Sequence, residues 1–239
     1  MIADRMHHSL QTTAQLTAVV EVDMTRLMLA RDRAKLAFER REGIPLSPFA
    51  LTAWAVCGVL PRHPVLNAEI DMEAGTVTYR RDVNLGVAVD TDHGLMVPTV
   101  HNAQDLSISG LARRIADLAA RARRRDLRPD DVTEGTFTLT NTGSRGVMLD
   151  TPILNPPQVA ILATTLIEKR PVVVTDEFGA DALAIRKMTY LCLSYDHRLV
   201  DGADAARFLT DLKHTLETRD LLPESETESQ APAGVGVTW

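Results

Sequence analysis

The sequence predicts an α+β fold in which a mixed β-sheet carries helices mainly on one face. Strand and helix patterns follow one another in blocks along the chain, whereas strict strand–helix alternation would favour a parallel, doubly wound sheet. The 239 residues are 45% hydrophobic but only 4% aromatic. Leu, Val, Ile and Ala must therefore fill the core of one large domain or two small ones.

The first quarter of the chain predicts one strand and two helices. Residues 13–24 alternate apolar and polar side chains, as a strand with one buried face does, and a helical pattern covers residues 25–42. Ser47 and Pro48 are typical of an N-cap and a first-turn proline. The helix that they begin, over residues 49–60, is apolar nearly all round and is therefore expected to be buried.

The middle of the chain predicts short strands followed by a long helix. The strand patterns cover residues 66–70, 76–80, 84–90 and 95–101. The last two flank Thr91-Asp92-His93-Gly94, which is typical of a hairpin turn. Ser107 is expected to cap a long amphipathic helix with a basic C-terminal end. Such an end is usually a solvated face, and the alternative is a site for a phosphate-bearing ligand or a partner.

The last third predicts three strands, one helix and a tail. The strand patterns cover residues 136–142, 159–167 and 182–196. A helix follows from Gly202, with an inward stripe of Ala205, Phe208 or Leu209, Leu212 and Leu216. From Pro223 the composition becomes polar and acidic. We therefore expect one folded domain over residues 1–222 and a flexible acidic tail over 223–239.

Composition excludes several classes of protein. The net charge of −6 and the pI near 5.6 argue against a nucleic-acid partner, which requires a basic face. No segment reaches the ~18 apolar residues that cross a bilayer, and the start of the chain lacks an apolar secretory core, so we expect a cytoplasmic protein. Cys57 and Cys192 lie in apolar runs and are expected to be buried free thiols. The scattered histidines show no metal-ligand spacing, and we expect no metal.

The strongest candidate for chemistry is a histidine turn. A strand over residues 188–193 leads into Ser194-Tyr195-Asp196-His197-Arg198-Leu199-Val200-Asp201-Gly202. A histidine at a strand end, with acids one residue before it and four after it, is typical of an oriented general base. Two structural alternatives stand beside this interpretation. Asp201 could simply cap the helix that begins near Gly202, and His197 could have a purely structural role.

Three segments in order resemble one family. His197-Arg198-Leu199-Val200-Asp201-Gly202 matches its His-x-x-x-Asp-Gly signature, while residues 135–143 (GTFTLTNTG) and 151–158 (TPILNPPQ) resemble its strand before the catalytic loop and the turn that follows. The family is that of the 2-oxoacid dehydrogenase dihydrolipoamide acyltransferases, whose fold and shorter signature chloramphenicol acetyltransferase shares. The resemblance spans residues 1–222.

The resemblance implies a chloramphenicol-acetyltransferase-like fold that assembles as a homotrimer, with active sites between subunits. Coenzyme A would enter each site from one end and dihydrolipoamide from the other. His197 takes the position of the general base, and Thr140 that of the hydroxyl that stabilises the tetrahedral oxyanion. Asp201 would fix the turn, including through an ion pair to a distant arginine, and Asn155 would shape its loop. Neither a metal nor a covalent acyl-enzyme is required.

The sequence also departs from full-length family members. None of its lysines (Lys35, Lys169, Lys187 and Lys213) lies in the hairpin of a lipoylated lysine, so the lipoyl group is expected from another domain or chain in trans. The chain is then either an excised catalytic part or a stand-alone relative with other thioester or small-molecule chemistry, and a non-catalytic trimeric scaffold is a further alternative. The acidic residues after Leu221-Leu222 favour a free trimer over a larger cage.

Overall fold

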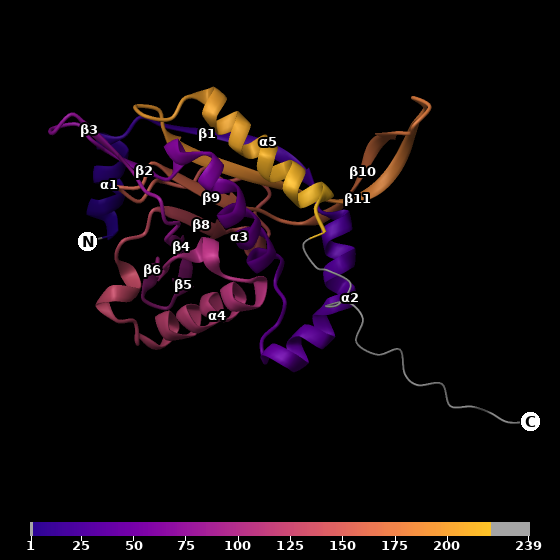
Figure 1. The fold of residues 1–239 in the computed structure, drawn as a ribbon, viewed down its shortest axis with the longest axis horizontal. Coiled ribbons are helices and arrows are strands. Elements are labelled where there is room, and N and C mark those ends of the chain that lie inside the picture. Colours follow the sequence, from indigo (N-terminus) through magenta and orange to yellow (C-terminus); the bar gives the residue numbers. More distant parts are fainter. Residues whose placement is uncertain (1, 221–239) are drawn as a thin grey trace, which may run out of the picture.

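The computed structural model describes residues 2–220, and side chains from residue 3 (Figure 1). The boundary predicted at residue 222 and the acidic tail predicted over 223–239 lie outside these residues. No helix within the described range is long and apolar enough to span a bilayer.

A mixed seven-stranded sheet forms the centre of the molecule, in the order β1-β11-β9-β8-β4-β7, with β10 paired to β11. The pairs β4–β8 and β8–β9 are parallel and the others are antiparallel. The strands are β1 (Gln15–Asp23), β4 (Leu85–Val87), β7 (Thr99–Val100), β8 (Phe137–Asn141), β9 (Ala160–Thr164), β10 (Glu168–Thr175) and β11 (Asp181–Asp196). Both parallel and antiparallel neighbours occur, so the predicted α+β class with a mixed sheet is confirmed.

Helices α3 (Pro48–Val59), α4 (Ile108–Arg124) and α5 (Gly202–Thr218) lie side by side over one face of this sheet (Figure 1). The other two helices are α1 (Ile2–Thr12) and α2 (Thr25–Glu42), and α2 contacts α5 and β11. The nearly all-apolar α3 lies between α4 and α5, while α5 packs on β1 and β11 (Figure 1). The inward stripe predicted for α5 is buried along its whole length. Because α3 is surrounded by other helices and the sheet, its apolar character all round is explained.

The predicted helix starts are confirmed at the two serine caps. The Ser47 hydroxyl accepts a hydrogen bond from Ala50 N at 3.1 Å, and Pro48 occupies the first turn of α3. The Ser107 hydroxyl accepts one from Gly110 N at 3.1 Å at the start of α4. Each hydroxyl satisfies one of the backbone N–H groups that a helix leaves free at its N-terminus.

Two predicted strands are each divided in the structure. Residues 84–90 and 95–101 give β4 and β7 in the central sheet, and β5 (Val89–Thr91) and β6 (Gly94–Met96) in a separate hairpin around the predicted turn. A second small hairpin, β2 (Ala68–Asp71) and β3 (Thr76–Tyr79), begins two residues later than predicted because residues 64–66 form a 3-10 turn.

The prediction missed α1 and β10, and it extended β9 to residue 167 although the strand ends at Thr164. The sequence of α1 is mostly polar, and its position depends on tertiary contacts. Buried Ser9 donates to Leu154 O at 2.8 Å, and Arg5 donates to the Asn155 side chain at 2.6 Å. Local periodicity contains no information about such partners.

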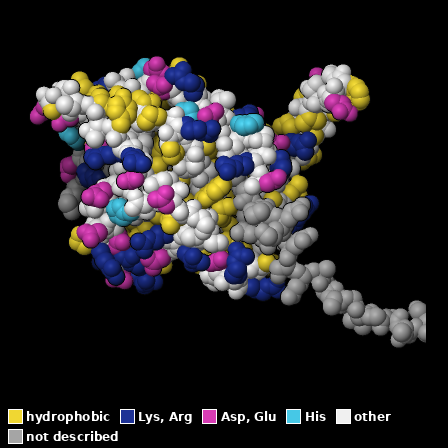
Figure 2. Space-filling model, in the orientation of Figure 1, with side chains coloured by type: hydrophobic (Ala, Val, Ile, Leu, Met, Phe, Trp, Pro, Cys, Tyr) yellow, Lys and Arg dark blue, Asp and Glu magenta, His cyan; other side chains and the backbone are white. Residues whose placement is uncertain are grey.

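β10 and the first half of β11 form an arm that projects from the body of the molecule (Figures 1 and 2). The register pairs Val173 with Leu183 and Pro171 with Ile185, so these four side chains share one face. Leu183 is 80% exposed, Val173 and Ile185 are 64% exposed, and Phe178 in the connecting turn is 88% exposed. The arm therefore carries an apolar face that no described part of this chain covers.

Candidate functional site

The histidine turn is closed by backbone hydrogen bonds at the end of β11. Asp196 O accepts from Leu199 N at 3.1 Å and from Val200 N at 2.9 Å, which folds the chain back before α5. His197 N donates to Ala14 O at 2.8 Å and so extends the β1–β11 pairing past the strand end. Tyr195 and Asp196 are buried while His197 is exposed. A rigid strand end thus presents the imidazole to solvent.

Asp196 and Arg198 form an ion pair beneath this turn, with a side-chain Nη2–Oδ2 distance of 2.6 Å. Arg198 Nε lies 3.0 Å from both carboxylate oxygens. Burial by itself raises the pKa of Asp196, but hydrogen bonds from Arg198 and Ala14 outweigh it and hold that pKa below its ordinary range. The sequence analysis noted Asp196 as the acid that precedes His197, but it made neither Asp196 nor Arg198 a candidate site residue. The signal for both is that they flank the candidate base in Asp196-His197-Arg198.

Asp201 is the N-cap of α5 and lies on the surface. Its carboxylate accepts a hydrogen bond from Asp204 N at 2.7 Å, and this bond lowers the pKa of Asp201. The ion pair to a distant arginine that the resemblance implied is not among the ion pairs of residues 2–220. The neighbouring Arg207 pairs with Asp204 at 2.5 Å instead. The helix-capping alternative for Asp201 therefore describes the structure, because the turn leads directly into α5.

Thr140 lies near the end of β8, half-buried, on the sheet face opposite to buried Leu139. Among the described residues its hydroxyl makes no hydrogen bond. It lines a cavity of about 570 Å³ between β8, α4 and the β5–β6 hairpin. Apolar side chains of this cavity include Phe49, Val87, Leu95, Ile115 and Val147. The hydroxyl is thus one of several polar groups in a pocket that also has an apolar wall, and it is free to bond a ligand.

Two further cavity residues, Asp90 and Arg145, form an ion pair on exposed side chains. Arg123, from the basic end of α4, also lines this cavity. The basic helix end that the sequence singled out therefore lies at the Thr140 cavity.

One copy of the chain does not bring His197 and Thr140 together. Tyr195 pairs with Ala160 at the start of β9, whereas Thr140 pairs with Ala163 near its end. His197 lies two residues beyond Tyr195, so the two candidates are about five residue levels apart. At ~3.3 Å per residue they are separated by roughly 16 Å along the strands. They lie at opposite ends of the sheet.

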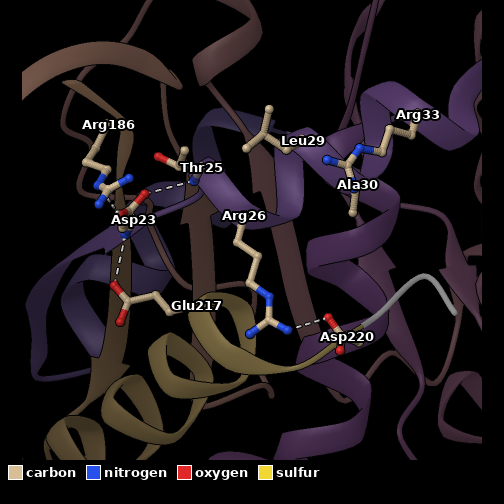
Figure 3. Close-up of a pocket in the computed structure, with 9 residues that line it drawn as sticks. All are labelled: Asp23, Thr25, Arg26, Leu29, Ala30, Arg33, Arg186, Glu217 and Asp220. Atoms are coloured by element: carbon tan, nitrogen blue, oxygen red, sulfur yellow. Dashed lines mark hydrogen bonds and ion pairs between the residues drawn. The ribbon is translucent and has the colours of Figure 1, made fainter. Parts of the chain in front are cut away.

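Another cavity, of about 700 Å³, lies elsewhere, between the start of α2 and the end of α5 (Figure 3). Four of its charged side chains form two ion pairs: Arg26 with Asp220 at 2.6 Å, and Arg186 with Asp23 at 3.5 Å. Glu217 accepts from the backbone N–H of Asp23 at 2.9 Å. None of the candidate site residues lines this cavity.

The two thiols are buried and free, as predicted. Burial raises the pKa of Cys57 to about 12 and also raises the pKa of Cys192, so neither is a ready nucleophile near neutral pH. Within residues 2–220 no group of three or more His, Cys, Asp or Glu side chains is arranged to hold a metal ion.

Sequence comparison finds one family over the whole of the described range. The family described as 2-oxoacid dehydrogenases acyltransferase (catalytic domain) matches residues 1–223. The acetyltransferase component of the pyruvate dehydrogenase complex of Mycobacterium tuberculosis is 53% identical over 90% of this chain and 39% of its own length. The succinyltransferase component of the 2-oxoglutarate dehydrogenase complex of Bartonella vinsonii is 43% identical over 92% and 52%. The chain spans about two-fifths to half of the length of these relatives.

Comparison with solved structures finds the same family. A probable dihydrolipoamide acetyltransferase from Listeria monocytogenes has a TM-score of 0.85 and 35% identity, over 97% of this chain and 93% of that one. The Azotobacter vinelandii acetyltransferase, solved to investigate a serine, a histidine and an asparagine in its catalytic mechanism, has a TM-score of 0.84 and 33% identity over 90% and 86%. Chloramphenicol acetyltransferase, at 18% identity and a TM-score of 0.55 over 90% and 94%, shares the fold.

Proposed function

This chain belongs to the family of 2-oxoacid dehydrogenase acyltransferase catalytic domains, and we propose that it moves an acyl group between dihydrolipoamide and coenzyme A. The observation that carries the proposal is the exposed His197 on a closed turn at the end of a buried strand. The lipoyl group comes from another domain or chain. Acetyl is the first acyl group to test, because the relatives at 53% and 50% identity are acetyltransferases.

The reaction needs a base and an oxyanion donor. His197 takes the proton of the coenzyme A thiol, and the thiolate sulfur attacks the carbonyl carbon of S-acyl-dihydrolipoamide. The Thr140 hydroxyl donates a hydrogen bond to the oxyanion of the tetrahedral intermediate. Collapse of the intermediate breaks the bond from carbon to the dihydrolipoamide sulfur, which takes the proton back from the imidazolium. The products are acyl-coenzyme A and dihydrolipoamide.

The spacing of residues supports these roles. The histidine and the asparagine studied in the Azotobacter enzyme are four residues apart, as are His197 and Asp201. In this chain the residue at the second position is an aspartate that caps α5. We assign it to holding the turn rather than to proton transfer.

We propose a homotrimer in which His197 of one copy meets Thr140 of the next. Two observations support it. The two residues lie at opposite ends of the sheet of one copy, so a complete site requires a second copy. The apolar face of the β10–β11 arm also lacks a cover in one copy, and a closed symmetric oligomer is the usual way to provide one. The acidic residues after Leu222 favour a free trimer over a larger cage.

Complementation tests the activity and the shared site together. His197→Ala and Thr140→Ala are each expected to lower the transfer of acetyl from acetyl-coenzyme A to dihydrolipoamide, the first by ~10²–10⁴-fold. Co-expressed, the two variants should recover roughly a quarter of the wild-type rate, because random mixing then builds that share of intact sites between copies.

Light scattering of the same samples should give the mass of three chains. A His197→Ala variant with wild-type kcat/KM would refute the assigned base. A lack of recovery in mixed assemblies would refute the shared site, and a monomeric mass would refute the trimer.

A further inference from the structure

We propose that Asp196 is a positioning residue for His197, and that its carboxylate, fixed by Arg198, holds the histidine turn against the residue preceding β1. The inference rests on the proposed role of His197 as the base. It assigns a function to an ion pair that has no part in the proton transfer itself.

The first step is that one carboxylate joins both chain segments that border His197. Asp196 Oδ1 accepts from Ala14 N at 3.2 Å, which belongs to the link between α1 and β1. The same oxygen accepts from Arg198 N at 3.1 Å, within the turn. Between these contacts His197 N donates to Ala14 O at 2.8 Å. Two hydrogen bonds therefore hold the histidine turn to Ala14. One comes from the backbone N–H of His197, and the other is accepted by the side chain of the preceding residue, Asp196.

The second step is that the imidazole has little other support. Within residues 2–220 its ring nitrogens make no hydrogen bond. Its aromatic neighbour is Tyr195, with ring centroids 5.9 Å apart. Because the ring has no hydrogen-bonded partner among these residues, its position depends mainly on the position of the backbone that carries it. Positions that control this backbone therefore control where the base lies relative to a thiol.

The third step is that the geometry requires an ionised carboxylate and a guanidinium. The Asp196 side chain is 2% exposed, and a buried charge without a partner is strongly destabilising. Arg198 Nε contacts both oxygens at 3.0 Å, and Nη2 contacts Oδ2 at 2.6 Å. The planar fork of an arginine makes such contacts, whereas a lysine ammonium cannot reproduce them. An asparagine would place an amide N–H₂ against one of these donors.

Asp196→Asn and Arg198→Lys test the proposal, with Arg80→Lys as the matched control. Arg80 makes a comparable two-point ion pair with Glu69, at 3.1 and 2.9 Å, away from the histidine turn. We expect kcat to fall by up to ~10²-fold in the two turn variants, with KM for acetyl-coenzyme A and for dihydrolipoamide changed less than ~2-fold, because a small misplacement of a catalytic group costs that much. The control should keep its kcat.

The deciding measurement is the double variant His197→Ala/Asp196→Asn. If Asp196 acts through His197, the double variant should be no slower than His197→Ala alone, since the base it positions is already gone. If the role of Asp196 is purely structural, the fold-losses in kcat of the two single variants should multiply in the double variant, and this result would overturn the inference. Wild-type kcat in both turn variants would overturn it as well.

Protein mass and thermal unfolding report whether each variant is folded. If Asp196→Asn does not fold, Arg198→Lys and its own double variant with His197→Ala decide in the same way. A His197→Ala variant with wild-type kcat would refute the proposed function itself. If His197→Ala is slow and the double variant is slower still by the factor lost in Asp196→Asn, only the positioning role is refuted.

Discussion

Asp201 accepts a hydrogen bond from the backbone N–H of Asp204 at 2.7 Å and is thereby the N-cap of α5. The aspartate of the His-x-x-x-Asp-Gly signature is thus bonded to the helix that follows the turn. It starts α5 four residues after His197, and α5 packs on β1 and β11. Its structural effect is to fix where the turn ends.

We expect Asp201→Ala to lower the melting temperature by a few degrees, because the alanine leaves an N–H at the start of α5 without a partner. Asp201→Asn should keep the melting temperature, since an asparagine caps as well as an aspartate. Thermal unfolding of the three proteins followed by circular dichroism at neutral pH provides the comparison. Equal melting temperatures for the Ala and Asn variants would contradict the capping role.

Lowering the pH should lower the free energy of unfolding, and the carboxyl group of Asp196 should contribute to this loss. The folded-state pKa of this carboxyl lies below its unfolded value of ~3.9. Its stabilisation is therefore fully present above the unfolded pKa and is lost as the pH falls through the folded pKa.

We expect the urea midpoint of the wild type to fall as the pH is lowered from 6 to about 3, and that of Asp196→Asn to start lower and fall less. Asp92→Asn, in the exposed β5–β6 turn, is the control and should follow the wild type. If the urea midpoints of the wild type and of Asp196→Asn fall by the same amount over this pH range, the prediction is contradicted.

Arg125 is a position where a glycine should stabilise the protein. It ends α4 in the left-handed conformation, with φ of 60°, and donates its backbone N–H to Ala122 O at 3.2 Å. A side chain is strained there and glycine is not. Arg125→Gly should therefore raise the free energy of unfolding by about 0.5–1 kcal/mol. Arg124→Gly, one residue earlier and inside the helix, should lower it by about the same amount. Urea titrations of the two variants measure both signs.

Local patterns were sufficient where a residue's environment follows from its neighbours in sequence. The serine caps of α3 and α4, the apolar α3 and the stripe of α5 are of this kind. α1 could not be found in this way, because Ser9 and Arg5 bond residues 145 and 150 positions away. The arm strand β10 was missed because its Val172-Val173-Val174 run lies on a projection whose outer face has no packing partner in one copy. Hydrophobic periodicity reflects which side chains are buried, and few side chains of β10 are buried in one copy.

The candidate site illustrates the same limit. His197 and Thr140 were selected from motifs, and nothing local could place them at opposite ends of one sheet, since this follows from the antiparallel pairing of β11 and the parallel pairing of β8 with β9. The role of Asp196 likewise depends on Ala14, which is 182 residues away. Such contacts appear only when the strands are paired.

The hydroxyl of Thr140 should matter to the transition state rather than to binding. Thr140→Ala should lower kcat by roughly 10²–10³-fold with little change in KM, because an oxyanion donor bonds charge that exists only during reaction. Thr140→Ser should recover most of the rate, since the hydroxyl is kept. Thr138→Ser is a matched control on the same strand face, where the hydroxyl donates to buried Gln158 at 2.5 Å and the serine retains it. Steady-state kinetics with acetyl-coenzyme A and dihydrolipoamide separate kcat from KM. Equal rates for Thr140→Ala and Thr140→Ser would mean that the methyl group or the strand position matters and that the hydroxyl does not.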